Sequence, residues 1–206
     1  MATVTFISTA DQISTMLATL KDLPIAPPNL YIDVESPIVP KLDVRDDSDR
    51  LFSRYRVDLK CVTDLQPMEL ATTTRRHRTH VNGLTACIDR DSGISDPQKD
   101  RTHIVKDQGR KLFATEKGIS YDVFNERPLQ SIVQEYYAMD VVHMPKLCSV
   151  YKARISAFWG VVVREAGEGR VRESQGSAYR SNDEGKRFGC WSEGVVREAM
   201  KRWKDE

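Results

Sequence analysis

The sequence predicts an α/β fold, in which helices pack on a sheet. Short apolar runs at residues 3–7 and 30–32 have the length and composition of strands. Between and after them, apolar residues recur every three or four positions, as on amphipathic helices. Strands that alternate with helices along one chain are typical of a sheet covered by helices.

The elements are expected in the following order. Residues 3–7 form a strand, and Thr9 caps a helix over residues 10–22. Three prolines then break the chain before the strand that ends at Glu35. The later elements are expected to be helices at 47–55, 65–71, 81–88, from 97, 129–140, from 145 past 163 and 192–206, with short strands at 40–44 and 60–64.

Two carboxylate motifs favour metal chemistry. On a strand, residues two apart point to the same face, so Asp33 and Glu35 lie side by side. On a helix, residues four apart share a face, so Tyr136 and Asp140 project together. Carboxylates bind hard divalent cations, and a phenol can orient an attacking water. Together the two motifs predict a two-metal phosphodiester hydrolase.

The order of the acidic motifs resembles that of a known superfamily. Between the two motifs lies an acidic segment, residues 43–50, at an expected strand-to-helix turn. The order Asp-x-Glu, acidic turn, Tyr-x-x-x-Asp is similar to that of the DEDD 3′–5′ exonucleases of the tyrosine subclass. The chain resembles ribonuclease D and, more closely, fungal and animal 3′–5′ exonuclease domain-containing proteins, over about residues 3–160. Further likeness lies at Asp64-Leu65-Gln66, Val81-Asn82-Gly83-Leu84 and Arg127-Pro128-Leu129.

The resemblance implies a ribonuclease H-like fold and a metal-dependent 3′–5′ exonuclease that acts on single-stranded RNA or DNA. Two ions, Mg²⁺ or Mn²⁺, would activate the water and stabilise the leaving oxygen. The four metal ligands implied are Asp33, Glu35, Asp47 and Asp140, and the catalytic set adds Tyr136 to them. Asp43, Asp46 and Asp49 are alternatives to Asp47 as the acid of the second motif.

The sequence departs from this family between the first two motifs. Family members have two strands and a helix there, whereas this chain has only residues 36–42, with prolines at 37 and 40. Parallel neighbouring strands need a crossover of about a dozen residues or more. We therefore expect either a rearranged sheet or a shortened exonuclease-like domain over residues 1–166. A flexible tail with a short C-terminal helix is expected over residues 167–206.

The shortening leaves a second hypothesis open. The chain would then be a catalytically impaired relative that serves as a nucleic-acid-binding or protein-interaction module. The basic run at residues 75–80 supplies Arg75, Arg76 and Arg78, which could hold a phosphate backbone. The alternative for this run is a solvated loop.

Composition restricts the partners. The formal charge is +1, so any attraction for nucleic acid must come from local patches. No run approaches the roughly 20 apolar residues of a membrane span, and the N-terminus is unlike a secretory signal. The four cysteines have no metal-ligand spacing. We expect an intracellular domain, in the cytoplasm or nucleus, with no membrane partner, and the sequence leaves the oligomeric state open.

Overall fold

A computed structural model describes residues 9–20, 43–73, 78–112 and 126–205, and the chain divides into two units, residues 1–32 and 33–206. The described part of the first unit is α1 (Ala10–Leu20) with its cap. The Thr9 backbone N–H donates to Gln12 Oε1, and the Gln12 backbone N–H donates to Thr9 Oγ1, each at 3.2 Å. This reciprocal arrangement confirms the predicted cap at Thr9.

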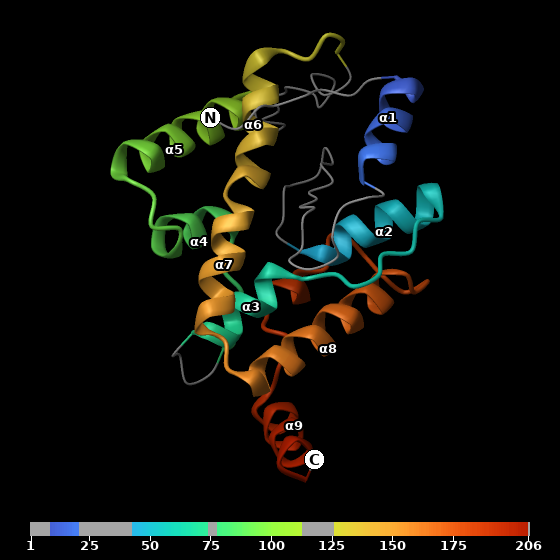
Figure 1. Ribbon diagram of the computed structural model, residues 1–206, viewed down its shortest axis with the longest axis vertical. Helices are drawn as coiled ribbons and strands as arrows, with labels where there is room; N and C mark the ends of the chain where they lie inside the picture. Colours follow the sequence, from blue (N-terminus) through green and yellow to red (C-terminus); the bar gives the residue numbers. More distant parts are fainter. Residues whose placement is uncertain (1–8, 21–42, 74–77, 113–125, 206) are drawn as a thin grey trace. The chain divides into compact units, whose positions relative to one another are not determined.

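The described part of the second unit is helical (Figure 1). Its helices are α2 (Val44–Tyr55), α3 (Leu65–Thr72), α4 (Leu84–Asp91), α5 (Asp96–Lys111), α6 (Ser131–Val142), α7 (Met144–Arg154), α8 (Ala157–Ser174), the 3₁₀ helix η3 (Glu184–Arg187) and α9 (Glu193–Asp205). Only His143 separates α6 from α7, and the two helices follow one another along almost one line.

The predicted α/β, ribonuclease H-like fold is wrong. No sheet forms among the described residues, where the strand-like pairing is a single bridge between His80 and Phe188. The expected strand at 60–64 is a mostly exposed segment in which Cys61 has a φ of 54°, a conformation that interrupts an extended strand. Asp64 instead caps α3 and accepts from the Gln66 backbone N–H at 3.0 Å.

The remaining expected strands have different outcomes. Residues 40–42 of the strand expected at 40–44 lie outside the described residues, and the other two belong to the start of α2, where Asp43 is the cap and Val44 is the first residue. The strands expected at 3–7 and 30–35 lie outside the described residues.

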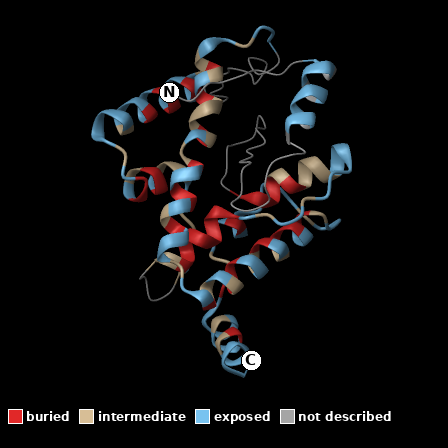
Figure 2. Cartoon of the chain, viewed as in Figure 1, coloured by how far each residue is buried: buried red, intermediate tan, exposed pale blue. Residues whose placement is uncertain are grey.

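The core of the second unit lies between helices. α8 packs against α2 and α3, α5 packs against α6, and α7 packs against α3, α4 and α6. Buried residues concentrate where α3, α7 and α8 meet (Figure 2). Each large apolar side chain buried in this way contributes roughly 1.5–3 kcal/mol. The most deeply buried apolar residues include Leu70, Ile88, Val133, Leu147 and Tyr151.

The helix expected from residue 145 past residue 163 is two helices. Ile155 is extended, with φ −78° and ψ 129°, and ends α7. Ser156 begins α8 as its cap, and its Oγ accepts from the Trp159 backbone N–H at 3.4 Å. A serine at this position satisfies an otherwise free amide at the start of the second helix.

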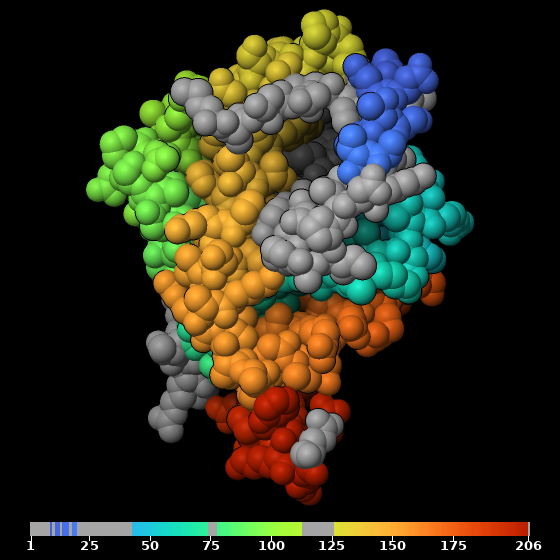
Figure 3. Space-filling model, in the orientation of Figure 1, coloured from blue at the N-terminus to red at the C-terminus, as the bar shows by residue number. Residues whose placement is uncertain are grey.

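The segment expected to be a flexible tail begins inside α8. Residues 167–174 are helical because Arg170, 4% exposed, joins α8 to the start of α3. Its guanidinium donates to Asp64 Oδ2 and to Gln66 Oε1, both at 2.8 Å. The expected C-terminal helix is present as α9, which lies at one end of the second unit next to α8 (Figure 3). The domain boundary after residue 166 stays a prediction.

Candidate functional site

Asp140 lies on α6 and is neutralised by a lysine of α5. Lys106 Nζ and Asp140 Oδ1 form an ion pair in which the two side chains are 8% and 3% exposed. Asp140 Oδ2 has no hydrogen-bond partner among the described residues. A buried carboxylate needs such a counter-charge because removing it from water is costly. The ion pair therefore holds α5 and α6 together.

Tyr136 completes this arrangement one turn before Asp140. Its side chain is 1% exposed, and Lys106 Nζ lies 4.1 Å from the centre of its ring. The ring rests on the α5 backbone at Gly109, where an added Cβ would lie 2.2 Å from Tyr136 Cδ2. We call Lys106, Gly109, Tyr136 and Asp140 the α5–α6 cluster. Tyr136 and Asp140 do share a face, as predicted, and that face is turned into a helix–helix contact.

The second motif places a different acid in contact with the rest of the unit. Asp47, the predicted ligand, is half-buried in the first turn of α2. Its neighbour Asp46 is 6% exposed, pairs with Lys186 Nζ and accepts from Tyr179 Oη at 2.6 Å. Asp46 therefore fastens α2 to the segment that leads into α9.

The other two acids of that motif are also on or beside α2. Asp43 accepts from the Arg45 backbone N–H at 3.0 Å and from the Arg45 side chain at 2.9 Å. Burial opposes the charged form of Asp43, but the hydrogen bonds and charge of Arg45 and the charge of Arg170 outweigh it and lower the pKa. Asp49 is half-buried further along the helix.

The predicted four-carboxylate site is only partly described. Asp33 and Glu35 lie outside the described residues. Asp47 belongs to α2, which packs on α8, whereas Asp140 belongs to α6, which packs on α5 and α7. Among the described residues no three histidine, cysteine, aspartate or glutamate side chains gather where a metal ion could bind. The convergence of the four carboxylates on Mg²⁺ or Mn²⁺ stays a prediction.

A second acidic centre has a structural role. Asp91, at the end of α4, accepts from Tyr151 Oη at 3.1 Å and from Arg154 Nη1 at 2.7 Å, and it also pairs with Arg90. Burial alone would raise the pKa of Asp91. The hydrogen bonds from Arg90 and Arg154 lower that pKa by more than burial raises it, so the pKa lies below its ordinary value.

We expect the chain to lose stability in acid. The carboxyls of Asp43 and Asp91 have pKa values below the ordinary 3.8, so both stabilise the folded state fully above pH 3.8. That contribution is lost as the pH falls below 3.8 and through the lowered values. Urea unfolding between about pH 2 and pH 7 should record the fall, and it should be shallower in Asp91→Asn, whose side chain does not titrate. An equal fall in Asp91→Asn would contradict this assignment.

Arg78, the described member of the predicted basic trio, anchors a turn. Its Nε donates to the Leu70 carbonyl at 2.8 Å and its Nη2 to the Thr73 carbonyl at 3.2 Å, at the C-terminal end of α3. Its guanidinium lies 4.3 Å from the centre of the Trp159 ring. Arg75 and Arg76 lie outside the described residues.

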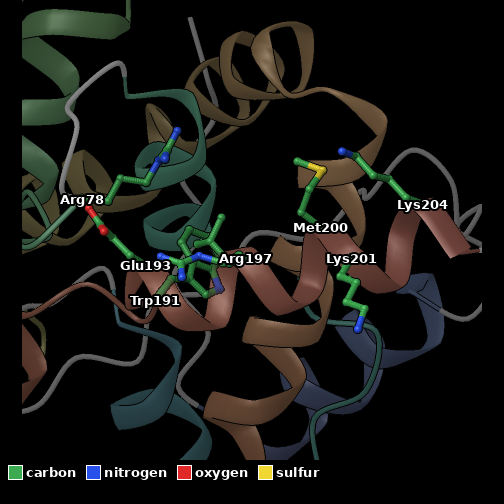
Figure 4. A pocket seen from close by; sticks show the side chains of 8 residues that line it. Arg78, Trp191, Glu193, Arg197, Met200, Lys201 and Lys204 are labelled. Carbon is green, nitrogen blue, oxygen red and sulfur yellow. The ribbon is translucent and has the colours of Figure 1, made fainter.

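A groove lies between Arg78 and α9, with a volume of about 580 Å³ (Figure 4). We call it the α9 groove. Its lining consists of Arg78, Trp191, Glu193, Val196, Arg197, Met200, Lys201 and Lys204. Four of these eight side chains are basic and one is acidic, so the groove carries a local positive charge that the net charge of +1 conceals.

Glycine at position 189 lets the chain beside Arg78 approach closely. The Gly189 backbone N–H donates to the Thr79 carbonyl at 2.9 Å. A Cβ at Gly189 would lie 2.1 Å from the Arg78 carbonyl oxygen, which a larger residue could not tolerate. This pairing brings the segment before Trp191 against Arg78 and so sets one wall of the groove.

Sequence reasoning missed the basic partners of the buried acids. The buried face of α5 consists of Thr102, Val105, Lys106 and Gly109. The last three follow Thr102 by three, four and seven residues, which is the spacing of one helix face. A lysine at a core-facing position is a detectable signal of a buried ion pair. Arg170 gave a weaker signal, because the glycines around it suggested a linker.

Comparison of the chain with protein-family models, with curated proteins and with solved structures finds no match. Within the described ranges, no helix has the length and apolar character needed to cross a membrane. The function must therefore be inferred from the geometry and from the residues themselves.

Proposed function

We propose that this protein is a catalytically inactive module that binds single-stranded nucleic acid without hydrolysing it. The observation that carries the proposal is the buried ion pair between Lys106 and Asp140. The acid that the motif assigns to the metal is already neutralised by a side chain of the same unit.

Loading a metal on Asp140 would require this ion pair to open. The cation would meet the Lys106 ammonium at the same carboxylate, and like charges repel. Displacing the ammonium would leave a buried charge without its partner, which costs several kcal/mol. Tyr136 is held by the same lysine and by the α5 backbone, so orienting a water would require the α5–α6 cluster to separate.

Binding is supported by features away from that cluster. The α9 groove gathers four basic side chains beside the half-buried apolar side chains of Val196 and Met200, and a positively charged groove of this kind can follow the backbone of a single strand. Nucleic acid is therefore the partner that fits the described surface.

We expect the full chain to bind a labelled single-stranded oligonucleotide and to leave it at full length. The affinity, measured by fluorescence anisotropy, should be the same with Mg²⁺ as with a chelator, because the proposed binding uses no metal. Product length on a denaturing gel provides the second readout. Mg²⁺-dependent shortening from the 3′ end that disappears in Asp140→Asn would overturn the proposal in favour of the exonuclease.

A further inference from the structure

Three of the cations that line the α9 groove belong to α9 itself. Arg197, Lys201 and Lys204 stand at i, i+4 and i+7, which places them along one face of α9. All three are exposed, and none of them forms an ion pair within the described part of the chain. Arg202, on another face of the same helix, approaches Glu165 of α8 at 3.6 Å. The groove-lining cations are therefore available to an external anion.

The spacing of these cations fits a polyanion better than a single anion. Seven helical positions at about 1.5 Å each span roughly 10 Å. A nucleic-acid strand carries one phosphate per nucleotide, so a row of cations of this length can meet successive phosphates of the same strand. Three basic side chains can thus each face one phosphate.

The other wall of the groove suits unpaired bases. Val196 and Met200, both half-buried, supply its apolar surface, together with the small exposed part of Trp191, which is 8% exposed. Trp191 is held in place by Trp159, with ring centroids 5.2 Å apart, and Arg78 covers the Trp159 ring. Bases exposed in a single strand can lie on such a surface, whereas a duplex keeps them stacked inside.

We infer that the α9 groove is the single-strand site of this protein, with the phosphates along Arg197, Lys201 and Lys204 and the bases against Val196 and Met200. The inference rests on the proposed function and assigns its location. An anionic membrane fits less well because part of the apolar face of α9 already packs on α8. Ala199 is buried, and Trp203 packs on Phe158 with ring centroids 6.2 Å apart.

The test compares two charge-matched double variants of the full chain. Arg197→Gln/Lys201→Gln removes two groove cations, and Arg172→Gln/Arg202→Gln removes two exposed arginines that do not line the groove. Binding of a labelled ten-residue oligothymidylate is followed by anisotropy at several salt concentrations. Circular dichroism melts confirm that both variants fold.

For the unaltered chain, the logarithm of the association constant should fall with the logarithm of salt with a slope of about −2, because each phosphate contact contributes about −0.7. The groove variant should bind on the order of tenfold more weakly at low salt, with a slope near −0.7. The control variant should retain the slope of the unaltered chain. Oligothymidylate should also quench tryptophan fluorescence, since Trp191 lines the site.

The outcomes separate the two inferences. Absence of binding by the unaltered chain would overturn the proposed function and the groove with it. Binding that the two double variants weaken equally would overturn the groove alone. Competition by polyglutamate at equal charge, or tighter binding to phosphatidylserine vesicles than to oligothymidylate, would replace nucleic acid with another polyanion.

Discussion

Lys106→Met is expected to lower the free energy of unfolding by about 3–5 kcal/mol, because it leaves the Asp140 carboxylate buried without its counter-charge. Asp140 is 2% exposed, so water cannot replace the ammonium without the helices separating. The same change removes the cation from the Tyr136 ring. Urea unfolding followed by circular dichroism measures the effect.

Two further variants isolate the cause. Lys111→Met, in the same helix, removes an exposed lysine that pairs with Asp107, and should cost less than about 1 kcal/mol. Lys106→Met/Asp140→Leu replaces both charges by apolar groups and should recover most of the loss. A double variant as unstable as the single variant would show that the lysine acts through something other than its pairing with Asp140.

Gly109→Ala is expected to destabilise the chain by about 3 kcal/mol, although alanine is the better helix former. The new methyl group would lie 2.2 Å from Tyr136 Cδ2 and 2.7 Å from Cγ, both on a ring that is 1% exposed. The ring has no solvent-filled space to move into, so α5 and α6 must separate. Thermal and urea unfolding should both record the loss.

Gly169→Ala is the matched control for this steric effect. Gly169 lies inside α8, and the nearest atom to its added Cβ is the flexible end of Arg172 at 4.0 Å. Alanine there should stabilise the chain by up to about 1 kcal/mol, the difference in helix propensity. If Gly109→Ala is also stabilising, Tyr136 does not pack on the α5 backbone as described.

The two destabilising variants, Lys106→Met and Gly109→Ala, also bear on function. The α5–α6 cluster contains two of the three described residues that were predicted to be catalytic, Tyr136 and Asp140. If both variants destabilise as expected, the cluster is a structural contact in the folded chain. Oligonucleotide binding by any folded variant should be unchanged, because the α9 groove contains none of these residues.

Local signals in the sequence predict where several described helices begin. Thr9 caps α1 as predicted, α3 begins at the predicted Leu65, and Pro97 lies in the first turn of α5. These signals are readable because a cap acts on amides two or three residues away. The same locality explains why the helix that carries Tyr136 and Asp140 was predicted correctly, including their shared face.

The contacts that those helix faces make depend on how distant helices pack. Asp140 meets Lys106 across 34 positions, Asp64 meets Arg170 across 106, and Asp46 meets Lys186 across 140. Periodicity indicates that a face is buried, but it does not identify the partner that neutralises a charge on it. A carboxylate that coordinates a metal and one that pairs with a lysine look alike along the chain. They differ in which cation reaches them when distant helices pack, and that packing is set by the whole second unit.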